Sequence, residues 1–238
     1  MSKFPEAMPH GEFEELFPDL FQVSGTMRGE FFGDMWQFGR NMFIVREGEE
    51  LTVFNSIRLD DAGMAELDSL GTVKNVVKLG SMHGYDDAYY LDRYDAATYW
   101  ALPGMPLTEG LQADKYLSED ELPVSNASLF SFAETKLPEA IVRLDREGGI
   151  MLACDALQNW EAADDHTDDA TKEKMTNMGF FTPCNCGPAW VHVNEPKPGD
   201  FARLKELSYE HALCGHGSPV RGDASGKYAV TFAKMFEV

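Results

Sequence analysis

The sequence predicts an α/β protein built as a layered sandwich. Short apolar runs rich in β-branched and aromatic residues recur in both halves of the chain and are typical of buried strands. Segments with helical spacing of apolar residues flank these runs but do not alternate with them one for one. Strands that dominate each half, with helices beside them, favour a layered sandwich over a regularly alternating, doubly wound sheet.

In the first half, the predicted strands cover residues 21–25, 41–46, 51–57, 73–79 and 98–102. Glu47-Gly48-Glu49 indicates a hairpin between the second and third of them. Residues 62–70 are expected to form a helix, because their apolar positions fall three apart and Asp60 or Asp61 can cap it. A second helix is expected over 87–94.

The second half shows the same preference for strands. Its predicted strands cover residues 127–132, 139–144 and 149–153, with a strand end at 212–214. Its predicted helices cover most of 156–178, then 201–207 and 225–236, and a Pro/Gly/Cys loop region is expected over 183–198. The chain is therefore expected to form an N-terminal arm over 1–20, which is apolar but without a period, and a single domain over 21–238.

The charge balance excludes some partners. The chain of 238 residues carries 40 Asp and Glu against 20 Lys and Arg, a formal net charge of −20. Such a field repels nucleic acid and an anionic membrane surface, so neither is an expected partner. No apolar run long enough to span a membrane and no secretory leader is predicted, and four cysteines indicate reduced thiols, so a cytoplasmic location is expected. The aromatic arm makes a homodimer contact a further expectation.

Metal-binding side chains follow short apolar strands at four places. These are Gly80–Asp87, Ala133-Glu134-Thr135, Cys154-Asp155 and Leu213–Gly217. Because side chains at strand ends converge on one crevice in α/β folds, and His, Asp and Glu bind divalent ions, a common site is predicted. Each position alone also fits a structural role: a lone His is often a hydrogen-bonded core residue, and Asp155 suits a helix cap.

The order of these pieces resembles the metallo-β-lactamase fold superfamily from about residue 21 to the end of the chain. Gly149–Leu157 (GIMLACDAL) is similar to the family strand that ends in a metal-bridging Asp. Cys214–Val220 (CGHGSPV) is similar to the late GHGxP loop that carries the last ligand His. The resemblance implies a four-layer αββα sandwich with a metal site at one edge, and a hydrolase acting on a small ester, lactone or amide-like substrate.

One loop departs from the family pattern. Where HxHxDH is expected, the chain reads HGYDDA over residues 83–88, which sets His83 on the first His, Asp87 on the Asp and Tyr85 on a lost His. An alternative alignment, shifted by two residues, sets Ser81, His83, Tyr85 and Asp86 on the motif. It preserves fewer of the motif's residues. The middle His is absent, and Glu134 stands near its place, 21 residues before Asp155. The implied ligands are His83, Asp87, Glu134, Asp155 and His216.

A set of three acids and two imidazoles favours a hard ion, so iron or manganese is expected as well as zinc. One divalent ion is expected rather than two, because two family His ligands are missing. Metal-activated water is the implied nucleophile. Asp87, if it is not a ligand, can take a proton from that water, and Tyr85 can donate to a developing oxyanion. The alternative is a non-catalytic relative that uses the crevice for binding or as a scaffold.

Two other donor-rich segments have competing interpretations. Cys184 and Cys186, with His192 and either Cys154 or Cys214, could form a structural metal cluster, although the spacing lacks the paired CxxC loops of such sites. The other interpretation is a rigid loop whose cysteines are buried. The acidic segment 164–169 lacks the EF-hand pattern and is expected to face solvent, with Asp168 or Asp169 capping a helix.

Overall fold

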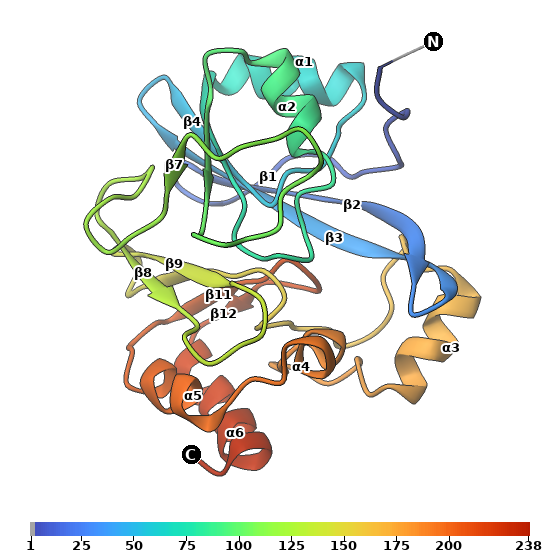
Figure 1. The fold of residues 1–238 in the computed structure, drawn as a ribbon, viewed down its shortest axis with the longest axis vertical. Helices are drawn as coiled ribbons and strands as arrows, with labels where there is room; N and C mark the ends of the chain where they lie inside the picture. The colour runs from blue at the N-terminus through green and yellow to red at the C-terminus, as the bar shows by residue number, and fades with distance from the viewer. Residues whose placement is uncertain (1–2) are drawn as a thin grey trace.

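A computed structural model describes residues 3–238 of the chain, which form two stacked β-sheets with helices on both outer sides (Figure 1). The seven-stranded sheet holds β1 (Glu14–Phe17), β2 (Leu20–Phe31), β3 (Asp34–Glu47), β4 (Glu50–Phe54), β5 (Thr72–Val77), β6 (Thr98–Ala101) and β7 (Lys115–Tyr116), in that order. The five-stranded sheet runs in the order β12 (Val220–Arg221), β11 (His211–Leu213), β10 (Ile150–Leu152), β9 (Ala140–Leu144), β8 (Ala127–Ser131). The helices are α1 (Asp61–Leu70), α2 (Asp87–Arg93), α3 (Asp169–Asn177), α4 (Pro188–Asn194), α5 (Pro198–Lys205) and α6 (Ala224–Phe236).

Alternation along the strands divides the core into layers. On β3, Phe43 and Val45 face the space between the sheets, whereas Met42 and Ile44 face the outer helices α1 and α2. On β10, Leu152 lies between the sheets and Met151 faces α4, α5 and α6. Successive strand residues point to opposite faces of a sheet, and here both sets are apolar. Each sheet therefore packs against the other sheet on one face and against helices on the other. The predicted αββα sandwich is confirmed.

Most predicted elements are found close to their expected bounds. The hairpin turn after β3 is present, and the predicted helix over 62–70 is α1, with Asp60 as its cap: the Asp60 side chain accepts a hydrogen bond from Gly63 N. Asp168, one of the two predicted caps in the acidic segment, begins α3 by accepting from Thr171 N.

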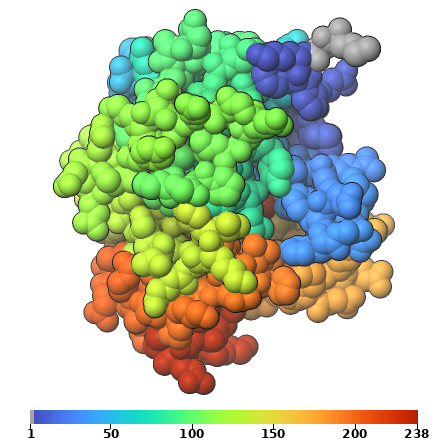
Figure 2. Space-filling model, in the orientation of Figure 1, coloured from blue at the N-terminus to red at the C-terminus, as the bar shows by residue number. Residues whose placement is uncertain are grey.

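The β2–β3 hairpin is much longer than predicted. Its strands have 12 and 14 residues and pair from Leu20–Val45 to Phe31–Asp34. Its outer part carries Gly, Arg and Glu, which gave no strand signal in the sequence. In Figures 1 and 2 the end of this hairpin lies beside the segment that bears α3, and Lys174 of α3 donates a hydrogen bond to the carbonyl oxygen of Met35.

Three local predictions are corrected. The predicted arm includes residues 1–2, which lie outside the described residues, and residues 14–17 of it pair with β2 as strand β1. Only the end of 156–178 is helical, as α3, because Gln158 and Asn159 near its start pair as isolated bridges with Asn185 and Gly217. The loop expected over 183–198 contains α4, which begins at Pro188, and proline is well suited to the first turn of a helix.

Among residues 3–238, no helix is both long enough and apolar enough to cross a membrane.

Candidate metal site

Three of the predicted ligands meet at one edge of the sandwich. His83, Asp155 and His216 lie in the loops that follow β5, β10 and β11. β10 and β11 are parallel neighbours, so their carboxyl ends open at the same edge. The loop after β5 reaches that edge from the other sheet, where Gly80 forms a bridge with Glu139. The two sheets therefore contribute to one crevice between them.

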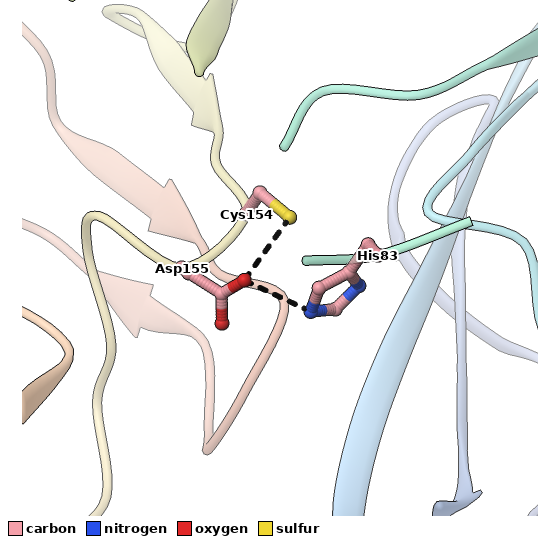
Figure 3. Close-up of side chains that lie close together, drawn as sticks. All are labelled: His83, Cys154 and Asp155. Carbon is pink, nitrogen blue, oxygen red and sulfur yellow. Dashed lines mark hydrogen bonds and ion pairs between the residues drawn. The ribbon is translucent and has the colours of Figure 1, made fainter. Parts of the chain in front are cut away.

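The donor atoms lie within contact distance of one another. His83 Nε2 is 3.0 Å from His216 Nε2. Asp155 turns one oxygen toward each ring: Oδ1 is 3.1 Å from His216 Nε2, and Oδ2 is 3.4 Å from His83 Nε2. Figure 3 shows His83 and Asp155 pointing toward each other from opposite sides of the crevice. All three side chains are buried.

A backbone contact fixes the orientation of the His216 ring. Its Nδ1 lies 2.8 Å from the carbonyl oxygen of Gly39 on β3. A carbonyl oxygen only accepts, so Nδ1 carries the proton and Nε2 presents a lone pair to the crevice. This is the arrangement in which a histidine binds a metal through Nε2 while its other nitrogen is held by a backbone partner.

The charges of the cluster are set by burial and by the neighbouring groups. Burial lowers the pKa of His83, so the ring is neutral near pH 7, as a ligand must be. Burial alone would raise the pKa of Asp155, but His83 and His216 hold it well below its usual range. Asp155 is therefore ionised, and its carboxylate faces the neutral His83 ring and the Nε2 atom of His216.

These donors fit a divalent ion. Donor atoms about 2.0–2.1 Å from a tetrahedral zinc ion lie about 3.3 Å from one another. The separations of 3.0, 3.1 and 3.4 Å in the cluster are close to that value. Two His and one carboxylate leave a fourth position open, as in catalytic sites.

Two further side chains lie beside the cluster. The ligand atoms of His83, Cys154 and Asp155 all fall within 4.8 Å of one another, and Figure 3 shows the Cys154 sulfur next to the carboxylate. Glu139 Oε1 accepts hydrogen bonds from the backbone N–H groups of Asp155 at 2.9 Å and Ala156 at 2.5 Å. Burial, reinforced by the charge of Asp155, raises the pKa of Glu139 well above its usual value.

Glu139 was missed as a site residue. The predicted strand over 139–144 begins at this residue, because an apolar run follows it. The sequence feature that could have indicated a site residue is an acid at the first position of a predicted buried strand, because a buried carboxylate needs hydrogen-bond donors or a cation beside it. Its role in the structure is to hold the backbone of the loop that carries Asp155.

The structure does not bring Asp87 to the cluster. Its carboxylate accepts hydrogen bonds from Ser56 Oγ and from the Tyr99 hydroxyl, each at 2.6 Å. Asp87 is fully buried at the first turn of α2 and is absent from the lining of the pocket in front of the donors. The carboxylate is already satisfied by two hydroxyl donors, so the expectation that it binds the ion or takes a proton in the crevice is corrected.

Glu134 also lies apart from the donors. It is exposed, and its carboxylate lies against Gly199 at the start of α5. The backbone N–H groups of Ala133 and Glu134 both donate to the Asp200 carboxylate, at 3.0 and 2.8 Å to its Oδ2. This binding of the loop to α5 turns Glu134 away from the crevice, so the structure leaves three of the five implied ligands together.

Tyr85 lines the mouth of a pocket that contains the donors. The pocket is lined by His83, Asp155 and His216 together with aromatic and Met side chains. The Tyr85 side chain is half exposed, and burial together with the charge of Asp155 raises the pKa of its hydroxyl. The hydroxyl therefore stays protonated at neutral pH and can donate a hydrogen bond.

The cysteine cluster does not form among the residues that the structure describes. Cys184, Cys186 and Cys214 are free, buried thiols in the core under α4 to α6, and no group of metal donors there includes them. The buried-loop interpretation is the one that holds. Asp164 in the acidic segment accepts hydrogen bonds from His166 N and Thr167 Oγ1 and so forms a local turn.

Three solved structures that share this architecture are metallo-β-lactamases. The metallo-β-lactamase DIM-1 matches with a TM-score of 0.61 at 12% identity, over 96% of this chain and 99% of that one. FIM-1 from Pseudomonas aeruginosa, in its mono-zinc form, gives 0.59 at 13% over 97% of both chains. The enzyme from Hirschia baltica gives 0.56 at 13%, over 95% and 98%. No family model and no curated protein sequence matches the chain.

Proposed function

Because the chain has the metallo-β-lactamase fold, we propose that it is a metal-dependent hydrolase of a small ester, lactone or amide-like substrate. The observation that carries this proposal is the convergence of His83 Nε2, His216 Nε2 and the Asp155 carboxylate within 3.0–3.4 Å at the base of a pocket. Three protein ligands and an open position are the composition of a catalytic rather than a structural zinc site.

His83, Asp155 and His216 would hold one divalent ion, and zinc, iron and manganese all accept two imidazoles and a carboxylate. Such an ion supplies Lewis acidity, which polarises a carbonyl oxygen and acidifies water. Tyr85 is the chain's own candidate for stabilising charge that develops on the substrate oxygen, because its protonated hydroxyl stands at the mouth of the same pocket.

Metal content and hydrolysis test the proposal together. Protein purified without chelators, or reconstituted with zinc, manganese or ferrous iron, is expected to hold about one equivalent of ion. It is then expected to hydrolyse members of a panel of aryl esters and lactones. His216→Ala and Asp155→Ala are expected to lose both properties, whereas Glu134→Gln, which changes an acid outside the cluster, is expected to keep both. Less than about a tenth of an equivalent in the reconstituted parent contradicts the proposal.

A second candidate is a protein that binds a ligand in this pocket without turning it over. The placement of Asp87 and Glu134 outside the cluster favours it, because fewer donors remain than the resemblance implies. A parent protein that holds one equivalent of ion and hydrolyses none of the panel would support this candidate over the hydrolase.

A further inference from the structure

A buried arginine lines the pocket beside the metal donors. Arg40 lies on β3, one residue after Gly39, whose carbonyl oxygen holds His216. Its side chain is only 8% exposed. Nη2 donates to Asp86 Oδ2 at 2.5 Å, while Nε has no hydrogen-bond partner among residues 3–238. A guanidinium has five N–H donors in a fixed fork, so one carboxylate oxygen leaves this group with unused capacity.

Arg40 is the one lysine or arginine among the described residues that line the pocket. The oxygen of Asp86 that Arg40 contacts also accepts a hydrogen bond from the backbone N–H of Arg58 at 3.0 Å. Asp86 therefore divides its charge between two donors. Among the described residues, Asp155 is the one carboxylate that lines the pocket, and its oxygens face the two imidazoles. Arg40 therefore remains the cation that is available to an anionic ligand in the pocket.

The walls are apolar and come from three separate parts of the chain: the β2–β3 hairpin, the loop after β5 and the segment around α3. Their aromatic members include Phe31, Trp36, Phe38, Tyr85, Trp160 and Phe180. Such a lining buries a flat or bulky apolar group and favours aromatic contact with it.

The aromatic wall reaches the metal donors directly. The Trp160 ring is stacked on His216 with ring centroids 6.1 Å apart and planes at 18°. Phe38 also packs against the His216 ring, with ring centroids 5.5 Å apart. An apolar group on these walls therefore lies next to His216 Nε2, and the same ligand can contact the walls, the cluster and Arg40.

We propose that this pocket selects an aromatic or bulky apolar molecule that carries one carboxylate, and that Arg40 binds this carboxylate as a specificity-determining residue. A single anionic group satisfies the guanidinium, and the net charge of −20 disfavours ligands with several negative charges. As a statement about substrate class, this inference rests on the proposed hydrolase function. As a statement about binding, it holds for the metal-free protein.

The test measures binding to chelator-treated protein, so it does not depend on metal or turnover. Phenylacetate, phenylacetamide and phenethylammonium share one apolar group and differ in charge. Their dissociation constants are measured by titration calorimetry and by the fluorescence of Trp36 and Trp160. The parent is expected to bind phenylacetate at least about tenfold more tightly than the amide, and the cation most weakly.

Replacing Arg40 alone leaves Asp86 without its partner, so the key variant is the double substitution Arg40→Met with Asp86→Asn. It is expected to bind the acid and the amide within about twofold of each other, because both members of the ion pair are neutralised. Arg40→Lys is expected to keep part of the preference, since it keeps the charge without the fork. Arg221→Met, which removes an exposed arginine on β12, is the matched control and is expected to keep the full preference.

The outcomes separate this inference from the proposed function. Equal binding of acid and amide by the parent overturns the role of Arg40, whatever the metal content. Tighter binding of phenethylammonium overturns it as well, and identifies the aromatic walls as a site for cations. A parent that prefers the acid but takes up no metal leaves Arg40 as the anion-binding residue and contradicts only the hydrolase.

Discussion

The Nε2 atoms of His83 and His216 lie 3.0 Å apart, although the residues are separated by 133 positions in the sequence. β3 holds one side of this contact. Gly39 fixes the His216 ring, and the Asn41 side-chain amide donates to the carbonyl oxygens of Cys214 at 2.9 Å and Gly217 at 2.7 Å. The first strands of the chain therefore fix a loop near its end.

Replacing Asn41 tests this link. Asn41→Leu removes both donors and leaves two carbonyl oxygens of the His216 loop without partners. A loss of about 1–3 kcal/mol for each buried, unpaired group is expected in the free energy of unfolding. Metal affinity is expected to fall about 10–100-fold, because such partners orient the ligand. Chemical denaturation and metal titration measure the two effects. An unchanged metal affinity would show that the backbone contacts of Gly39 and Asn41 suffice to position the ring.

A substitution at Asp87 distinguishes between the two ways of aligning the loop over residues 83–88 with the HxHxDH pattern. Asp87→Asn keeps the shape but removes one hydroxyl acceptor and the charge, so a loss of about 1.5–3 kcal/mol in the free energy of unfolding is expected. Metal affinity is expected to stay within about threefold of the parent, since the carboxylate is bonded to Ser56 and Tyr99. A large loss of affinity without a loss of stability would restore Asp87 as a ligand.

Apolar runs and the polar residues that follow them predicted the short strands and the positions of three site residues. The strand that ends at Leu152 and the loop with His216 are apolar runs followed by polar side chains, and their parallel pairing at one edge follows from the sandwich itself. The convergence of His83, Asp155 and His216 could therefore be predicted from order along the chain. The long hairpin could not, because its end is held by contacts with α3 and not by its own composition.

Acidic residues were harder to place than histidines, because carboxylates have many structural roles. Glu134 and Glu139 stand five residues apart in one turn, and the sequence pattern favoured the first. Asp200, from a helix far along the chain, binds the backbone at Glu134 and turns it outward, which leaves Glu139 as the buried acid. That choice depends on a contact between distant segments, which a single sequence does not show.

The four thiols are expected to resist alkylation in the folded protein. All are buried, and burial raises the pKa of Cys154 well above its usual value and that of Cys214 to about 12. A thiolate is the reactive form, so iodoacetamide near pH 8 is expected to label none of them within minutes. Mass spectrometry is expected to find four adducts per chain in denaturant. Rapid labelling of Cys154 in the native protein would instead show that the crevice opens to solvent.

The cap of α3 gives a pH dependence whose sign can be worked out. Asp168 accepts a hydrogen bond from Thr171 N at 2.7 Å, and this backbone contact lowers the pKa of the carboxyl. A carboxyl whose pKa is lower in the folded state stabilises the protein above its ordinary pKa. That contribution is lost as pH falls from the ordinary pKa of Asp through the lower folded-state pKa, so the effect of the charge is expected to disappear on the acid side of the ordinary pKa.

Two substitutions at Asp168 separate the charge from the cap. Asp168→Asn keeps a good cap and is expected to remove only the pH-dependent part of the stability. Asp168→Ala is expected to cost about 1 kcal/mol near neutral pH, since the first turn of α3 loses its acceptor. Thermal unfolding of the three proteins between about pH 3 and 7 measures both effects.

Because Met175 of α3 lines the pocket, Asp168→Ala is also expected to weaken phenylacetate binding more than Asp168→Asn does. Equal binding by the two variants would show that the pocket wall does not depend on this cap.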